Sequence, residues 1–114
     1  MAAEPLTPAV FHILLSLADG EKHGYGIMQE VAARTNSSFL MGPGTLYGTL
    51  KRMLEAGLIE ESGERRDPAL DDQRRRYYRL TRQGRRAGAS EAERLEGLVR
   101  QARAKSLLKQ PQTA

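Results

Sequence analysis

Residues 42–60 read GPGTLYGTLKRMLEAGLIE and hold the start signal, the stop signal and the two unlike faces of one predicted helix. Gly42 suits the N-cap, and Pro43 suits the first helical position because its fixed φ is helical and its missing N–H costs nothing there. Gly57 predicts the C-terminal end. Apolar residues recur between these signals at three- and four-residue steps, which predicts a stripe in the core. The stripe consists of Leu46, Leu50, Met53 and Leu54.

The opposite face of this helix is small and polar. It carries Gly44, Thr45, Gly48, Lys51, Arg52 and Glu55, with Tyr47 at its border. Small residues allow a helix backbone to approach a partner closely, and hydroxyls and cations supply hydrogen bonds, as a DNA groove requires. An ordinary amphipathic surface helix has the same pattern, so the residues that follow must decide between the two interpretations.

The residues after this helix predict a β-hairpin. Residues 58–62 read as a short strand, residues 63–73 as a polar loop and residues 74–80 as a second strand. In the second strand, alternation places Arg76, Tyr78 and Leu80 on one face, and Arg75, Tyr77 and Arg79 on the other. A helix followed by a strand, a charged loop and a strand is the arrangement of a recognition helix with its wing.

Basic charge is concentrated from this hairpin onward. The 114 residues have a formal net charge of +4. Residues 1–60 hold four basic and six acidic side chains, net −2, whereas residues 61–114 hold fourteen basic and eight acidic ones, net +6. Residues 74–86 contain seven arginines and no acid. Such a run of one sign indicates a polyanionic partner, because a solvated face usually mixes signs.

The composition also argues against other classes of function. The chain has no cysteine, which excludes a disulfide, a thiolate zinc site and a cysteine nucleophile. His12 and His23 lack the clustered carboxylates of a metal site, and residues 42–48 lack the spacing and βαβ context of a phosphate loop. We therefore expect no enzyme activity and no cofactor. The N-terminus has no signal-peptide pattern and no stretch is apolar enough to span a bilayer, so we expect a cytoplasmic protein.

Two further helices are predicted before residue 42. Thr7 and Pro8 open a mostly apolar helix that ends near Gly20. A turn after it leads into a second helix that runs to about Thr35, and residues 39–41 predict a brief strand. Three helices followed by a hairpin predict a mainly α (α+β) fold, a winged helix-turn-helix, with the DNA-binding domain over residues 1–81.

Thr81 caps a fourth predicted helix, which continues to about residue 107 or 108. Its later part has a narrow apolar stripe of Ala92, Leu95, Leu98, Val99 and Ala102. So small a domain has little core left for this stripe to cover, which favours packing against a second copy of the chain. We predict a dimerisation helix over residues 82–108, with Phe11 in the same interface, and a disordered tail over residues 109–114. The stripe lacks aromatic residues, which argues against a membrane-surface helix.

These segments, taken in order, resemble the PadR family of bacterial transcriptional regulators from Leu6 to about Ala104. The matching pieces are Leu6-Thr7-Pro8, Ile13-Leu14, His23-Gly24-Tyr25 with Ile27, Gly44-Thr45-Leu46-Tyr47 with Leu50 and Leu54, Gly57-Leu58-Ile59, and Tyr77-Tyr78-Arg79-Leu80-Thr81 with Gly84-Arg85. The resemblance implies a homodimer of the branch with a single C-terminal helix, which represses transcription by binding double-stranded DNA at a dyad-symmetric operator. It also implies a small-molecule effector at the dimer interface. Some relatives stack flat ligands on an interface tryptophan, and that mode cannot apply because this chain has no tryptophan.

We assign the DNA contacts as hypotheses. Thr45, Tyr47, Lys51 and Arg52 are expected to face the major groove or its flanking phosphates, with Gly44 and Gly48 permitting close approach. Tyr25 is expected at the phosphate backbone near the N-terminus of the second helix, and Arg65, Arg66, Arg74, Arg75 and Arg76 at phosphates or a minor-groove edge. Two alternatives stay open. Tyr25 and Tyr47 can instead pack at helix junctions, and the winged helix can instead bind protein or RNA without a specific operator.

Overall fold

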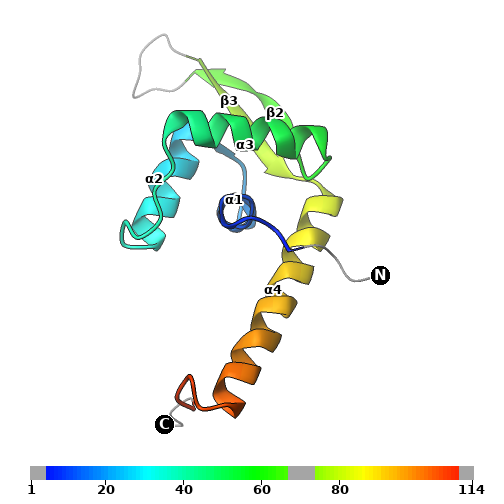
Figure 1. The fold of residues 1–114 in the computed structure, drawn as a ribbon. Helices are drawn as coiled ribbons and strands as arrows, with labels where there is room; N and C mark the ends of the chain where they lie inside the picture. The colour runs from blue at the N-terminus through cyan, green and yellow to red at the C-terminus, as the bar shows by residue number, and fades with distance from the viewer. Residues whose placement is uncertain (1–4, 67–73, 111–114) are drawn as a thin grey trace.

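The computed structural model describes residues 5–66 and 74–110. The elements in chain order are α1 (Pro8–Leu17), β1 (Lys22–His23), α2 (Gly24–Arg34), α3 (Pro43–Glu55), β2 (Ile59–Arg66), β3 (Arg74–Leu80) and α4 (Arg82–Ala104). The strands form an antiparallel sheet in the order β1-β3-β2. In Figure 1, α3 lies across the β2–β3 hairpin, and α4 projects away from the other helices. This arrangement confirms the predicted winged helix-turn-helix.

Helix α3 begins and ends where the sequence predicts. Gly42 is its N-cap, with extended backbone angles (φ −75°, ψ 167°), and Pro43 is the first helical residue. At the other end Gly57 has a φ of +76°, a region that only glycine reaches without strain. The N–H of Leu58 donates to the Met53 carbonyl (3.0 Å) and the N–H of Gly57 to the Leu54 carbonyl (3.1 Å). These two bonds form a Schellman turn, which directs the chain from α3 straight into β2.

The core lies between α1, α2, α3 and the hairpin and is almost entirely aliphatic. It consists of Ile13, Leu14, Leu17, Ile27, Val31, Met41, Leu46, Leu50, Met53, Ile59 and Tyr78. The predicted stripe of α3 is buried except for Leu54, which is partly buried. Thr49 is also buried, because its hydroxyl donates to the Thr45 carbonyl at 2.6 Å and so needs no water. Burial of these side chains is the main source of stability in so small a domain.

The sheet differs from the prediction in two respects. Strand β2 does not stop at Ser62 but continues to Arg66, across a bulge in which Ser62 is passed over between the pairs Glu61↔Tyr78 and Gly63↔Tyr77. Gly63 has a φ of +126° there, so a glycine that reads as a loop residue belongs to the strand. The rest of the predicted loop, residues 67–73, lies outside the described residues.

Strand β1 was not predicted, because two residues give no periodic signal. Lys22 pairs with Tyr78, and His23 pairs with Tyr77. Conversely, the brief strand predicted over residues 39–41 is wrong, since this described segment is an irregular connection. Asn36 and Ser37 have positive φ values (51° and 62°) and turn the chain immediately after α2, and the three-stranded sheet of the described residues, β1-β3-β2, does not include this segment.

Helix α4 starts as predicted, with the Thr81 hydroxyl accepting from the Gly84 N–H at 3.0 Å. It ends at Ala104, earlier than predicted, because Ser106 has a φ of +66° and the Leu107 N–H folds back to the Ala102 carbonyl at 2.8 Å. The predicted tail begins at Lys109, whose carbonyl accepts from Arg103 Nε at 3.2 Å, and residues 111–114 lie outside the described residues. No helix within the described ranges combines the length and the apolar character needed to cross a membrane.

Gly84 marks the tightest contact between α4 and the rest of the fold. A Cβ atom at this position would lie 1.9 Å from the Leu58 carbonyl oxygen and 2.9 Å from its carbonyl carbon. Backbone at the start of β2 cannot yield as a flexible side chain can. We expect Gly84→Ala to lower the free energy of unfolding by about 2–4 kcal/mol, because either α4 or the turn must move.

Urea unfolding followed by circular dichroism, at one protein concentration, measures this effect. Gly97→Ala is the matched control, since a Cβ there would come no closer than 4.0 Å to another side chain of the described chain. Alanine should be neutral or stabilising by up to about 1 kcal/mol at that helical position. Equal stability of both variants would show that Gly84 is not required for close packing.

His12 and Arg34 join α1 to α2. Arg34 donates through Nη1 to His12 Nδ1 (3.2 Å) and through Nη2 to the His12 carbonyl (3.2 Å), while Arg34 Nε donates to Glu30 (2.9 Å). The His12 ring lies 4.4 Å from that of Phe39. Because a guanidinium can only donate, Nδ1 must be unprotonated in this arrangement. Desolvation, followed by the charge of Arg34, lowers the pKa of His12 below its usual value of 6.5, with a smaller opposing effect from Glu30.

This contact predicts a loss of stability in mild acid. The neutral form of His12 is favoured by folding, so its contribution is complete above about pH 6.5 and is lost as pH falls through the lower pKa of the folded state. The free energy of unfolding of the unaltered protein should therefore fall more between about pH 7.5 and about pH 5.5 than that of His12→Asn, which keeps an acceptor but cannot titrate. Parallel pH profiles of the two proteins in urea unfolding would contradict this assignment.

Candidate nucleic-acid interface

The exposed face of α3 carries the residues predicted to enter a DNA groove. Thr45, Tyr47, Lys51 and Arg52 are exposed, and Gly48 is half-buried. Arg52 folds back along its own helix, donating through Nη2 to Thr49 Oγ1 at 3.3 Å, and its Nη1 lies 3.7 Å from where a Gly48 Cβ would be. At Gly44 a Cβ would meet no described atom within 4 Å, so a partner can approach the backbone there.

Tyr47 connects this face to the N-terminus of α2. A Cβ at Gly24 would lie 2.7 Å from the Tyr47 hydroxyl and 2.9 Å from its ring, so the tyrosine packs directly on the α2 backbone. Even so, 46% of its surface stays exposed. Tyr47 therefore packs at a helix junction, as the alternative interpretation expected, and still keeps surface that a partner can contact.

Tyr25 and Arg75 form the next part of this surface. The Arg75 guanidinium carbon lies 5.0 Å from the centroid of the Tyr25 ring, within the range of a cation–π contact, and 46% of the tyrosine is exposed. Arg75 of β3 thus meets Tyr25 of α2, and Tyr47 of α3 packs on the neighbouring Gly24, while the contacts of these residues with DNA stay predictions. The contact between Tyr25 and Arg75 is not visible in the sequence, where 50 residues separate them.

His23 is a structural member of the site that sequence reasoning missed. Its Nδ1 accepts from the Gly26 N–H at 2.9 Å and so caps α2, and its ring lies edge-on to Tyr77, with 5.3 Å between the ring centroids. The cap fixes the first turn of α2, which carries Tyr25 and packs against Tyr47. No signal in the sequence indicates this role, because the residues preferred at an N-cap are serine, threonine, aspartate and asparagine.

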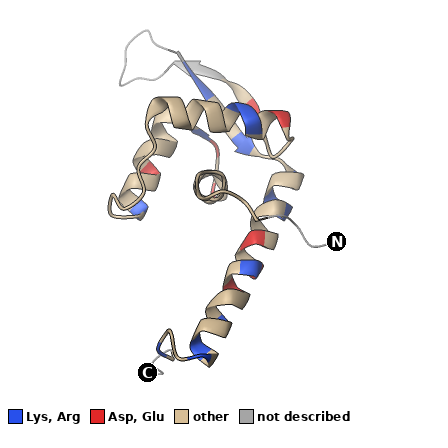
Figure 2. Cartoon of the chain, viewed as in Figure 1, with Lys and Arg blue, Asp and Glu red and all other residues tan. Residues whose placement is uncertain are grey.

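The register of the hairpin sets arginine against arginine. Arg65 lies opposite Arg75, and Arg66 lies opposite Arg74. Like charges on directly opposed residues of an antiparallel pair are destabilising, and a bound polyanion removes that cost. The bulge at Ser62 gives two such pairs instead of one, because without its one-residue shift Arg65 would lie opposite Arg74 and Arg66 opposite Gln73. Figure 2 shows basic positions on β3 and on α3, and α3 contacts β2.

Nearer the base of the wing, arginines are balanced by glutamates. Arg79 Nε lies 2.8 Å from a Glu60 carboxylate oxygen, and Arg76 Nη1 lies 3.5 Å from Glu61. These exposed pairs contribute little to stability. Arg76, which was predicted to contact DNA, therefore differs from the opposed arginines farther out, because the Glu61 carboxylate offsets its charge.

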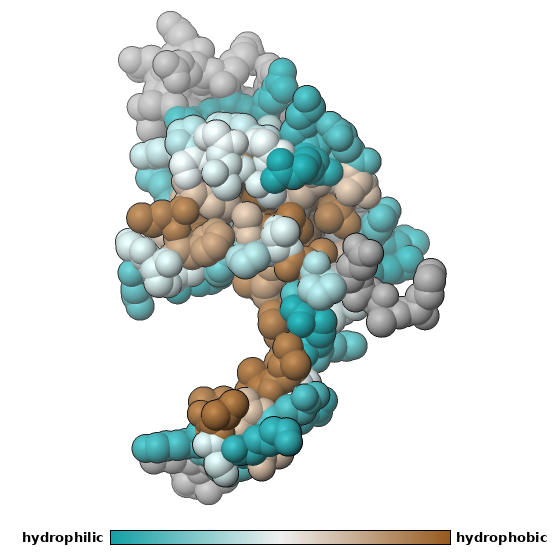
Figure 3. All heavy atoms as spheres, in the orientation of Figure 1, coloured by the Kyte–Doolittle hydropathy of each residue, from teal (hydrophilic) through white to brown (hydrophobic). Residues whose placement is uncertain are grey.

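The residues predicted for a dimer interface follow one side of α4. Leu95, Leu98 and Val99 are 36%, 48% and 38% exposed. Figure 3 shows this apolar surface continuing down α4 from the body of the fold. Ala92 is exposed and Ala102 half-buried on the same side. An exposed apolar row of this length on a projecting helix is typical of an interaction surface.

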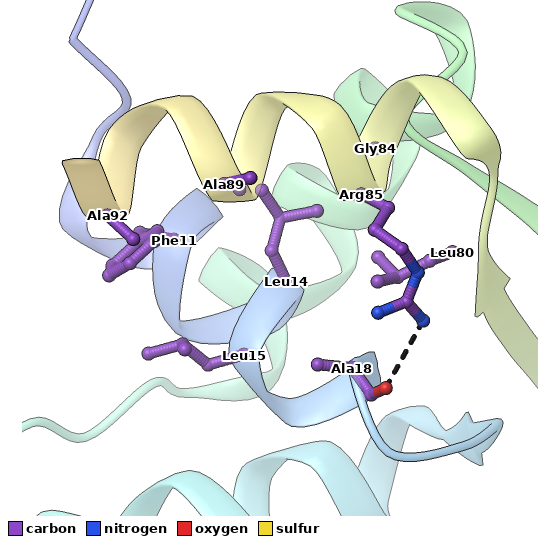
Figure 4. Close-up of a pocket in the computed structure, with 10 residues that line it drawn as sticks. Phe11, Leu14, Leu15, Ala18, Leu80, Gly84, Arg85, Ala89 and Ala92 are labelled. Carbon is purple, nitrogen blue, oxygen red and sulfur yellow. Dashed lines mark hydrogen bonds between the residues drawn. The ribbon is translucent and has the colours of Figure 1, made fainter. Parts of the chain in front are cut away.

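Phe11 and Ala92 border a cavity of about 210 Å³ between α1 and α4. Its walls are almost entirely apolar, and Arg85 is the charged residue among them (Figure 4). The other lining residues are Leu14, Leu15, Ala18, Leu80, Gly84, Gly88 and Ala89. Within the described parts of the chain, no three histidine or carboxylate side chains are grouped so as to hold a metal ion.

Comparison with known proteins places this geometry in a family. Residues 13–90 match the transcriptional regulator PadR-like family. The chain is 39% identical over 90 residues to the transcriptional regulator Rv3488 of Mycobacterium tuberculosis, covering 79% of this chain and 78% of that protein.

Two solved structures share the fold. A PadR family transcription regulator from Clostridium difficile R20291 has a TM-score of 0.71 at 24% identity, covering 90% of this chain and 100% of the other. PadR of Bacillus subtilis, solved in complex with operator DNA, has a TM-score of 0.61 at 17% identity, covering 92% of this chain and 49% of the other. These findings confirm the resemblance seen in the sequence: the chain belongs to the PadR-like family of transcriptional regulators.

Proposed function

We propose that this chain is a homodimeric repressor that binds a dyad-symmetric operator through α3 and the β2–β3 hairpin. The observation that carries the proposal is the pairing of Arg65 with Arg75 and of Arg66 with Arg74 across the hairpin beside an exposed, small and polar helix face. Opposed arginines lower the stability of the folded chain, and the phosphates of a duplex remove this repulsion by neutralising their charge. The fold shared with Bacillus subtilis PadR, solved with operator DNA, supports the same partner.

In this proposal α3 reads the sequence. Thr45, Tyr47, Lys51 and Arg52 face the major groove or the phosphates at its edges, since a helix fits that groove and their side chains are exposed on one face. Gly44 and Gly48 let the backbone approach closely. The space around Gly44 supports this role, because a side chain there would point only into solvent or into a partner.

The hairpin and α2 hold the duplex in position. Tyr25 and the N–H groups at the start of α2 meet phosphates, with Arg75 held over the Tyr25 ring at 5.0 Å. The arginines at positions 65, 66, 74 and 76 meet phosphates or the edge of the minor groove, where a planar guanidinium fits well. Such contacts raise affinity for every sequence and carry little preference.

Dimerisation through α4 would give the operator its symmetry. Leu95, Leu98 and Val99 present an apolar row to a second copy, and a two-fold dimer places two α3 helices on one face of the duplex. Reading two successive major grooves requires a separation of about 34–36 Å between them. Division of the chain into a DNA-binding part (1–81) and a dimerisation part (82–108) remains part of the proposal.

An effector that releases DNA would bind in the cavity between α1 and α4. The cavity adjoins Phe11 and Ala92, which belong to the proposed dimer interface, and its apolar walls suit a small apolar molecule. The alternative function is a winged helix that binds protein or RNA without a specific operator. No feature of the described residues favours that alternative over a duplex.

The DNA-binding proposal predicts different effects for Lys51 and Arg75. Selection from a random duplex pool with the purified protein should return a dyad-symmetric motif, which then serves as the probe in fluorescence anisotropy. Lys51→Ala should lower the ratio of motif to random-duplex affinity by about fivefold to a hundredfold. Arg75→Ala should weaken binding to both duplexes alike and reduce the slope of log affinity against log salt by about one.

Arg100→Ala is the matched control, because it removes the same charge from an exposed position on the far part of α4. It should leave the affinity ratio and the salt slope unchanged. Failure to enrich any motif, or equal affinity for single-stranded RNA and duplex DNA, would contradict the proposal and favour the alternative.

The dimer proposal predicts that Leu98→Glu dissociates the protein. A carboxylate within the apolar row must be desolvated on association, so the dimer dissociation constant should rise at least about thirtyfold, equivalent to about 2 kcal/mol. Sedimentation velocity over a concentration series measures this constant. Ala104→Glu adds the same charge at an exposed position on the opposite side of α4 and should leave it within about threefold. A monomeric parent protein, or equal effects of the two variants, would exclude this interface.

A further inference from the structure

The first turn of α4 is hydrogen-bonded to the C-terminal end of α3, the proposed recognition helix, and to the turn after it. Three successive carbonyls at that end accept hydrogen bonds from residues at the start of α4. Thr81 N–H donates to the Leu58 carbonyl (3.1 Å), Thr81 Oγ1 to the Gly57 carbonyl (2.6 Å) and Gln83 Nε2 to the Ala56 carbonyl (3.3 Å). The Ala56 carbonyl belongs to the C-cap of α3 and has no partner within the helix, and the Gly57 and Leu58 carbonyls belong to the turn that follows, so these donors bind groups that would otherwise need water.

The same turn is also hydrogen-bonded to the C-terminal end of α1. Arg85 Nη2 donates to the Ala18 carbonyl at 3.2 Å, and Ala18 is the C-cap of α1. Figure 4 shows Arg85 reaching from α4 across to this carbonyl. A guanidinium at a helix C-terminus is also favoured by the helix dipole. One turn of α4 is therefore hydrogen-bonded to the C-terminal ends of two helices.

The packing around this turn is unequal. On the side of α3, Gly84 lies so close to the Leu58 carbonyl that no Cβ fits, which fixes the start of α4. On the side of α1, Leu14 lies within van der Waals range of α4, 3.8 Å from where a Gly88 Cβ would be, but beside this contact the cavity of about 210 Å³ lies between α4 and Leu15. Packed side chains resist tilting, whereas an apolar hollow does not. The hydrogen bond from Arg85 to Ala18 spans this hollow side, so it limits the tilt of α4 toward or away from α1.

We infer that Gln83 and Arg85 are positioning residues, which hold α3 at a defined angle to α4 and so set the half-site spacing that the dimer accepts. The inference rests on the proposed function. Leu98 lies about 20 Å along α4 from Gly84, so a tilt of about 10° at the junction moves Leu98 by roughly 3.5 Å relative to α3, about one base-pair step. A change of that size on each protomer alters which spacing both recognition helices can reach.

The test is the double variant Gln83→Ala with Arg85→Ala, measured on three kinds of duplex. These are the selected dyad operator, operators with half-sites one base pair closer or farther apart, and a single half-site. The variant should lose at least about fivefold in affinity for the dyad operator and discriminate less between spacings, while its affinity for the single half-site stays within about twofold. Arg85→Lys should restore much of the discrimination, because an ammonium can still donate to the Ala18 carbonyl.

Arg86→Ala is the control for lost charge. Arg86 is exposed one residue farther along, and no hydrogen bond or ion pair joins its side chain to the described residues. A second readout needs no DNA. The chain has no cysteine, so Glu55→Cys, at the exposed end of α3, accepts one spin label per protomer. The distance distribution between the two labels of a dimer should broaden or shift in the double variant and not in Arg86→Ala.

Each outcome decides something definite. If the double variant loses affinity equally for the single half-site and for the dyad operator, these residues act on stability or contact DNA themselves, and the inference is overturned. Unchanged spacing preference together with an unchanged label distance would also overturn it. If the parent protein itself shows no preference for a dyad operator, the proposed function fails, and the label distances alone then show whether the junction holds α3 to α4.

Discussion

The turn over residues 56–58 is the constraint on which the rest of the structure depends. Gly57, with its φ of +76°, closes α3 and aims the next residues into β2. The carbonyls of all three turn residues then receive donors from the start of α4. One reversal of the chain thus sets the positions of α3, the β2–β3 hairpin and α4 together. A side chain at Gly57 would strain the backbone and disturb all three.

Around this turn, the buried residues stabilise the fold and the exposed cations form the surface proposed to bind DNA. The aliphatic stripe of α3, with α1 and α2, supplies the buried area, and on the opposite face of α3 Tyr47 packs against α2 while Thr45, Lys51 and Arg52 stay exposed. That face and the hairpin carry exposed cations and opposed arginines, which reduce stability in the absence of a partner. A domain with little net stability tolerates only a few such costs, and their concentration at one surface indicates what that surface binds.

Much of the fold could be predicted because its signals are local. The helix start at Pro43, the stop at Gly57 and the cap at Thr81 each depend on neighbouring residues, and the structure confirms them. Other features could not be predicted. Strand β1 exists only because β3 pairs with it, and β2 continues beyond Ser62 because a bulge leaves that residue without a partner in the ladder. Helix α4 ends at Ala104 although its apolar pattern continues, since Ser106 turns the chain back.

By itself the sequence determined the order of the helices and strands, the buried side of α3, and the concentration of arginine after residue 60, because helix caps, periodicity and charge are properties of neighbouring residues. Only the tertiary structure decided which distant residues meet. It placed Arg75 over Tyr25, Tyr47 on Gly24, and the first turn of α4 on the ends of α1 and α3. These contacts depend on strand register and on the close approach at Gly84, which arise from packing between segments far apart in the chain.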